Sequence, residues 1–218
     1  METSLNYYSL GEEIANSITH GVGIMLAITA LGILTAFAGI YGNIWYIVSV
    51  SIYGSTMILL YTASTLYHSI QYPRVKRILR ILDHSAIYLF IAGTYTPFTL
   101  VTLRDGQWGW WLFGVIWGFA LLGVVLQLSI MKRWPAVSLC LYIGMGWAIV
   151  LAIKPLIVSL DTGGIVFLIL GGLAYTIGII FYGWDKLKFN HAIWHLFVLT
   201  GSILHFFAVL FYVIPIQS

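Results

Sequence analysis

Seven apolar runs, each close to the length that crosses a lipid bilayer, constrain this chain more than any other feature. A transmembrane helix needs roughly 20 predominantly apolar residues, and short polar breaks separate the runs. Only 8% of the residues are charged, against about 25% in an ordinary soluble domain. We therefore predict an all-α integral membrane protein, one seven-transmembrane helix bundle over residues 1–218 that begins with a short cytoplasmic segment of about residues 1–14. The expected spans are about 15–39, 44–67, 81–103, 108–130, 136–158, 164–184 and 191–214.

The polar breaks give the chain a direction across the membrane. Because alternate breaks lie on opposite faces, the Lys and Arg residues can be sorted, and eight of the ten lie on the side of the N-terminus. Arg104 and Lys154 lie on the other side. By the positive-inside bias, the N-terminus is expected in the cytoplasm and the C-terminus outside. The eight residues are Arg74, Lys76, Arg77, Arg80, Lys132, Arg133, Lys186 and Lys188.

The composition excludes several classes of function. The formal net charge is +3 and the basic residues lie in short loops, so the chain is not expected to bind nucleic acid. The single cysteine, Cys140, excludes an intramolecular disulfide and a cysteine-based zinc cluster. The N-terminus is acidic where a secretory signal is basic, so the first apolar run is expected to stay as a span. Membrane lipids are the expected partners.

Two histidines four residues apart interrupt the last apolar run. His191 and His195 project from one face of the predicted helix, which is the spacing that lets one metal ion contact both imidazoles. Hydrocarbon offers no solvation to such groups, so they must be buried against partners or bound to a ligand. The pattern fits a metal site, and it fits equally two histidines that are hydrogen-bonded separately.

Three more polar residues are expected at the same membrane depth. Ser64 and His68 lie at the cytoplasmic end of the second span, and Asp83 lies at the cytoplasmic start of the third. Ser64 and His68 share a helix face because they are four residues apart. Each residue also has a simpler explanation. The serine can bond a carbonyl of its own helix, the histidine can be interfacial, and Asp83 can cap its helix or pair with Arg80.

Together these residues have a chemical logic that none has alone. Neutral imidazoles from His68, His191 and His195 can supply three ligands to a divalent ion and leave a fourth tetrahedral position for water. Zinc is the metal that this set favours, although such sites accept other first-row ions. Asp83 and Ser64 are then placed to orient the water or take its proton. We therefore predict a zinc site with these two residues as catalytic groups.

The remaining histidines are expected to play other parts. His205 lies ten residues beyond His195, hence ~15 Å further along the helix, so an interhelical hydrogen bond is expected for it. His84 points about 100° away from Asp83 around the helix, which favours an outward or loop-facing role. His20 belongs to a polar stripe that we interpret as a second wall of the cavity, with helix-start capping as the alternative. The stripe comprises Glu13, Asn16, Ser17 and His20.

These residues resemble the motif set of the bacterial hemolysin III proteins. The likeness rests on the stretch from Glu12 to Gly21, on Ser64 to His68, on Leu82 to Ser85 and on His191 to His195. The motifs follow one another in order over nearly the whole chain. The family is similar to a prokaryotic branch of the progestin and adipoQ receptor superfamily, which includes the adiponectin receptors and is related to alkaline ceramidases.

The resemblance implies a seven-helix bundle in the bacterial plasma membrane, with the N-terminus inside and zinc bound near the cytoplasmic leaflet. It implies His68, His191 and His195 as the ligands, with Asp83 and Ser64 around the metal-bound water. Better-known members of the superfamily are associated with hydrolysis of lipid amides such as ceramides. Bacterial members are associated with haemolysis, pore formation and membrane-fluidity homeostasis.

Three functional hypotheses are consistent with the sequence. The first is metal-dependent hydrolysis of an amide or ester bond in a lipid that reaches the site from the cytoplasmic leaflet. The second is a pore-forming cytolysin, against which seven hydrophobic spans without a secretory signal weigh. The third is a membrane sensor in which zinc is structural and clamps the second span to the seventh.

Overall fold

The computed structural model describes residues 8–129 and 135–215, and every regular element in these ranges is a helix. Seven helical segments are long and apolar enough to cross a membrane, which confirms the predicted architecture. Residues 1–7, which include Glu2, and the basic break at Lys132 and Arg133 lie outside the described residues. The elements are α1 (Leu10–Tyr41), α2 (Ile44–Ser69), α3 (Pro73–Pro97), η1 (Phe98–Thr102), α4 (Gln107–Ser129), α5 (Pro135–Trp147), η3 (Ala148–Ala152), α6 (Ile153–Ser159), α7 (Thr162–Tyr182), α8 (Asn190–Ala208) and η4 (Val209–Val213).

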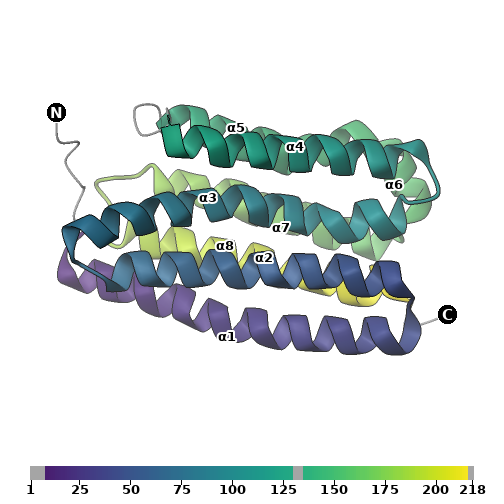
Figure 1. Cartoon of the computed structure of the whole chain (residues 1–218), viewed down its shortest axis with the longest axis horizontal. Coiled ribbons are helices and arrows are strands. Elements are labelled where there is room, and N and C mark those ends of the chain that lie inside the picture. The colour runs from purple at the N-terminus through teal and green to yellow at the C-terminus, as the bar shows by residue number, and fades with distance from the viewer. Residues whose placement is uncertain (1–7, 130–134, 216–218) are drawn as a thin grey trace.

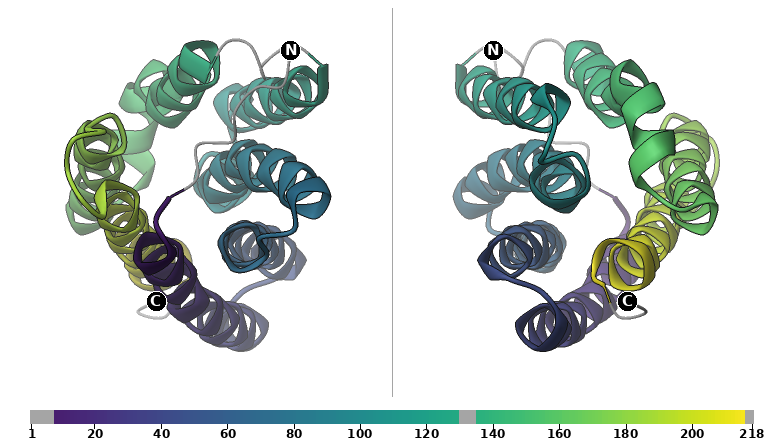
Figure 2. Two further views of the ribbon diagram at one scale, coloured as in Figure 1. Left: turned by 90° about the vertical axis from the view of Figure 1, so that its left-hand side faces the viewer. Right: turned by 90° about the vertical axis from the view of Figure 1, so that its right-hand side faces the viewer.

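The helices run side by side along one axis (Figure 1). Seen from the end they form a ring, in which α1 packs between α2 and α8 (Figure 2). The starts of α1, α3 and α8 and the end of α2 lie at one end of the bundle, and the C-terminal end of the chain lies at the other (Figure 1). Which end faces the cytoplasm remains a prediction from the distribution of charge.

Two helices begin well before the apolar runs that they contain. A capping box starts α1: the Ser9 hydroxyl accepts from the Glu12 N–H at 3.4 Å, and the Glu12 carboxylate accepts from the Ser9 N–H at 2.9 Å. Pro73 at the first position starts α3, where its missing N–H leaves no intrahelical bond unmade. The expected start of the third span near residue 81 is therefore too late. The basic residues of the expected loop lie instead on the first turns of α3.

The fifth span is not a continuous α-helix, because a 3₁₀ turn, η3, separates α5 from α6. A buried tyrosine of α3 contacts the backbone at this break. The Tyr95 hydroxyl accepts from the Ile149 N–H at 2.9 Å and lies 2.8 Å from the carbonyl oxygens of Met145 and Gly146, to one of which it can donate. The hydroxyl thus pairs backbone groups that have few other partners in hydrocarbon.

We expect Tyr95→Phe to lower the free energy of unfolding by about 1–3 kcal/mol, because it leaves the partly buried Ile149 N–H without its acceptor. The measurement is thermal unfolding of the purified protein in detergent. Tyr41→Phe is the matched control, since Tyr41 is the last residue of α1 and is 48% exposed. An equal effect of both substitutions would contradict this role of Tyr95.

Candidate metal centre

Three histidines that are far apart in the sequence meet at one end of the bundle. His68 comes from the end of α2, and His191 and His195 come from the first two turns of α8. One ligand atom from each lies within 4.8 Å of the others, and the ring centroids are 4.5 to 5.3 Å apart. The fold therefore brings together all three predicted ligands.

The donor set has room for a cation. Among the described residues, Nε2 of His68 and both ring nitrogens of His191 are buried without a hydrogen-bond partner. Buried polar atoms are nearly always paired, so orphaned nitrogens on two neighbouring imidazole rings indicate that a ligand is expected between the rings. Three imidazoles that leave the fourth tetrahedral position free match the open type of zinc site.

Asp83 and Ser64 lie beside the three histidines. Both are buried, and the Ser64 hydroxyl is a hydrogen-bonding neighbour of the Asp83 carboxyl group. They line a cavity of about 420 Å³ together with His191 and His195. Asp83 lies well inside α3, so it does not cap that helix as the simpler explanation supposed.

His84 differs from its expected outward role. Its Nδ1 donates to the Arg80 carbonyl at 2.8 Å and lies 3.6 Å from Oδ2 of Asp83. The ring also lines the cavity. The offset of adjacent residues around a helix was a poor guide here, because the bond to the carbonyl four residues back holds this ring near the Asp83 side chain. The ion pair of Asp83 found among the described residues is thus with His84 and not with Arg80.

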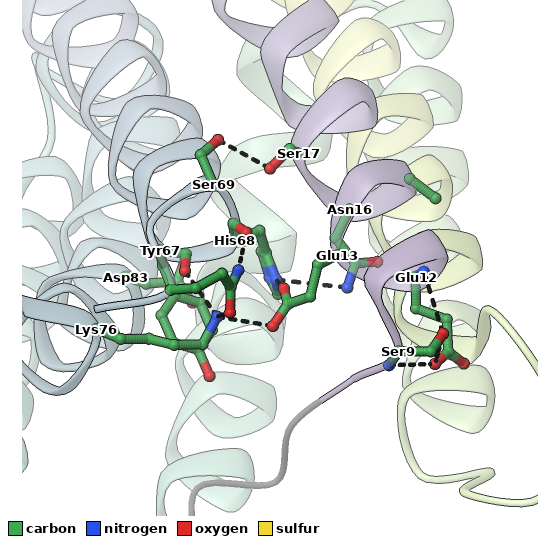
Figure 3. A network of polar contacts seen from close by, with 12 residues as sticks. Ser9, Glu12, Glu13, Asn16, Ser17, Tyr67, His68, Ser69, Lys76 and Asp83 are labelled. Atoms are coloured by element: carbon green, nitrogen blue, oxygen red, sulfur yellow. Dashed lines mark hydrogen bonds and ion pairs between the residues drawn. The ribbon is translucent and has the colours of Figure 1, made fainter. Parts of the chain in front are cut away.

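A buried ion pair adjoins His68, and the sequence interpretation did not identify it. Oε2 of Glu13 lies 2.6 Å from Nδ1 of His68, and Oε1 of Glu13 accepts from Nζ of Lys76 at 2.7 Å (Figure 3). Lys76 is fully buried and also donates to the Tyr67 carbonyl at 3.1 Å and to Gln71 at 3.0 Å. Lys76 was assigned to a cytoplasmic loop. The sequence does contain a signal for the burial of Lys76. Pro73 is typical of a helix start, and a helix from Pro73 places Lys76 and Asp83, seven residues apart, on one face of α3.

Three residues of the α1 polar stripe, Glu13, Asn16 and His20, contact the histidine cluster, whereas the Ser17 hydroxyl lies 2.9 Å from the Ser69 hydroxyl at an exposed position. Nδ1 of His195 lies 3.1 Å from the Thr19 hydroxyl and 3.2 Å from the Asn16 carbonyl, so α1 holds the ring by that nitrogen. The His20 ring stacks on His195 with centroids 3.5 Å apart, and it lines the cavity. His205 makes the expected interhelical hydrogen bond, with Nε2 lying 3.3 Å from the Leu168 carbonyl of α7.

Tyr8, just before α1, covers the histidine cluster from the end of the bundle. Its ring centroid lies 5.2 Å from that of His191 and 6.0 Å from that of His68. Burial raises the pKa of the Tyr8 phenol above its usual range, so the group is neutral at physiological pH. A neutral phenol adds an apolar face to the site without adding charge.

All residues of the candidate site lie in the part of the chain that matches one protein family. A family model described as "Haemolysin-III related" matches residues 8–206. The chain is 53% identical over 207 residues to Hemolysin-3 of Bacillus cereus, covering 95% of this chain and 94% of that protein. It is 50% identical over 209 residues to the Hemolysin-3 homolog of Bacillus subtilis (strain 168), covering 96% and 98%. It is also 30% identical over 205 residues to the monocyte to macrophage differentiation factor of Homo sapiens, covering 91% and 83%.

We expect Lys76→Met to lower the free energy of unfolding by about 3–5 kcal/mol, because it leaves the buried Glu13 carboxylate without its cation. Arg77→Met, at the exposed neighbouring position, should change it by less than about 0.5 kcal/mol. Thermal unfolding in detergent compares the two. A Lys76 variant as stable as the Arg77 variant would show that the buried pair contributes nothing.

Proposed function

The chain belongs to the hemolysin III family, the bacterial branch of the progestin and adipoQ receptor superfamily, and from this we propose that it is a zinc-dependent hydrolase of a membrane lipid. It is a multi-pass protein of the bacterial cell membrane. The observation that supports the proposal best is the cluster of three imidazoles, two of which line a cavity together with the Asp83 carboxyl group and the Ser64 hydroxyl. The bond cleaved is an amide or an ester.

In this proposal His68, His191 and His195 hold the metal. The orphaned nitrogens of His68 and His191 support the assignment, because a cation bound there would pair with Nε2 of His68 and with one ring nitrogen of His191. Bound zinc supplies a Lewis acid for the carbonyl and a water whose pKa is lowered toward ~7. The histidines themselves set where that chemistry happens, at the end of the cavity that is lined by Asp83 and Ser64.

Asp83 takes the proton of the attacking water and passes it to the leaving group. Its burial beside Ser64 supports this role, since the hydroxyl restrains the carboxyl group in one orientation. Ser64 is part of α2 four residues before His68, so one helix face presents both the hydroxyl and a ligand. The proton acceptor is thereby fixed relative to the metal.

The cavity holds the lipid. Its volume of about 420 Å³ lies within the ~300–1,000 Å³ range of small-molecule sites. Apolar side chains from several helices line it, among them Leu60, Ile87, Phe90, Ile91 and Val198. An acyl chain that fills this space displaces water from the apolar part of the cavity and leaves water only beside Asp83, Ser64 and the histidines. The exposed cations Arg74, Arg77, Lys186 and Lys188 lie at that end of the bundle, which supports the cytoplasmic leaflet as the source of the lipid.

Purified wild-type protein should contain about one zinc per chain, and His191→Ala should lose most of it. Elemental analysis of protein in detergent measures the ratio. His205→Gln is the control on the same helix, because His205 bonds the Leu168 carbonyl and lies ~15 Å from the cluster along α8. Equal zinc in the two variants would exclude the histidine cluster as the site.

Asp83→Asn should bind zinc but lower turnover roughly 10²–10⁴-fold, because an amide cannot accept the proton. Lipid profiles of membranes from cells that express each variant report the turnover as lost substrate and gained product. Asp161→Asn, exposed before α7, is the matched control. A lipid profile of Asp83→Asn that equals wild type would favour zinc as a purely structural ion in a membrane sensor.

The names of the two Bacillus relatives favour cytolysis as the second candidate function. On that candidate, purified protein releases fluorescent markers of graded size from liposomes. Release that is equal for wild type and His191→Ala would separate a pore from the metal centre and would favour cytolysis over hydrolysis.

A further inference from the structure

The first turn of α1 contacts both helices that carry the histidine cluster. Glu12 and Glu13 are adjacent, and adjacent residues on a helix point about 100° apart, so their carboxyl groups reach different neighbours. Glu13 faces the His68 ring of α2 and Lys76 of α3. Glu12 faces the start of α8, where its Oε1 accepts from the Phe189 N–H at 3.1 Å. α1 itself packs between α2 and α8.

Glu13 determines which nitrogen of His68 faces the cluster. A carboxylate is only an acceptor, so at 2.6 Å the proton of the ring is on Nδ1. The lone pair is then on Nε2, which is buried and without a partner among the described residues. Lys76 occupies the other oxygen of Glu13 at 2.7 Å and keeps the carboxylate in this orientation. A metal-binding histidine is commonly oriented in this way through its second nitrogen.

Glu12 holds the turn from which α8 starts. Phe189, before the first residue of α8, has φ 59° and ψ 20°, a left-handed conformation that bulky residues rarely adopt. Such a backbone persists where its surroundings hold it. Oε1 of Glu12 takes the Phe189 N–H, while Oε2 accepts from Ser9 at 2.7 Å, which keeps the Glu12 side chain in place. His191 follows two residues later, so the same turn sets where the α8 ligands begin.

We propose that Glu12 and Glu13 are positioning residues of the metal centre, which together set the distance between the α2 ligand and the α8 ligands. The inference rests on the proposed function, because it takes the three histidines as the metal ligands. Glu13 orients His68 within its helix, and Glu12 anchors the start of the helix that carries His191 and His195. One turn of α1 thus joins two helices through two neighbouring side chains.

Glu13→Gln tests the role of Glu13. His68 and Lys76 bond different oxygens of Glu13, and an amide replaces one of these acceptors by an NH₂ group, which faces a donor. Zinc affinity, measured by competition with a chromophoric chelator on the full chain in detergent, should fall roughly 10–100-fold. Glu12→Ala should also weaken zinc binding, since it frees the Phe189 N–H. Asp185→Asn, exposed at the same end of the bundle, should bind zinc as wild type does.

A second measurement separates positioning from general stabilisation. At a given zinc concentration, tighter binding raises the unfolding temperature more, so a positioning role predicts a smaller zinc-induced rise in Glu13→Gln than in wild type. A merely structural role predicts that the unfolding temperatures with and without zinc fall equally. That second pattern, or wild-type affinity in folded Glu13→Gln, overturns the proposal for Glu13.

A double variant covers the case in which Glu13→Gln does not fold. In Glu13→Gln with Lys76→Met, the amide oxygen has to accept only from His68, so folding and part of the zinc affinity should return. A folded double variant that binds zinc no better than Glu13→Ala with Lys76→Met overturns the orienting role. If the wild-type chain takes up no zinc, the metal centre itself fails, which is a different result from equal binding by wild type and variants.

Discussion

Water is scarce between the helices of this bundle, and each polar side chain there must find its partner within the protein. That constraint explains why the polar residues gather instead of spreading along the spans. Glu13, His68 and Lys76 satisfy one another from three helices. Ring nitrogens of His68 and His191 nevertheless have no partner among the described residues, and one ligand atom of each lies within 4.8 Å of the other and of one ligand atom of His195. His20, stacked on His195, also has two buried ring nitrogens without a partner among the described residues, but His68, His191 and His195 are the group whose ligand atoms lie close enough to hold one cation.

The ring of helices turns local spacing into a site. On α8 a separation of four residues already aligns His191 and His195, but the third imidazole comes from α2, which lies on the other side of α1. The side chains of Glu13 and Thr19 in α1 contact His68 of α2 and His195 of α8, so the inserted helix joins the two ligand-bearing helices rather than separating them. The apolar cavity then extends from this polar end into the bundle. The polar residues of the candidate site therefore lie at one end of the cavity that we propose for a lipid chain.

On the proposed function, this arrangement suits the helix bundle to hydrolysis of a lipid. A carboxyl group and a hydroxyl lie beside the imidazoles, and the lining further from them is mainly apolar. Membership of the hemolysin III family accounts for the order of the motifs along the chain, and the geometry gives those motifs a chemical reason to occur together. The family name and the site point to different activities, which direct measurement of zinc and lipids distinguishes.

The sequence alone determined the seven spans and the residues of the candidate site, because apolar length and helical spacing are local properties. His191 with His195, and Ser64 with His68, share a helix face whatever surrounds them. The prediction of a cytoplasmic N-terminus rests entirely on the uneven distribution of Lys and Arg between the two faces. Only the tertiary structure decided that Glu13 pairs with His68 and Lys76, that His84 turns toward Asp83, and that Tyr95 bridges the break in the fifth span. The reason is physical: these contacts join helices or depend on one side-chain rotamer, and no periodic pattern along a single helix specifies them.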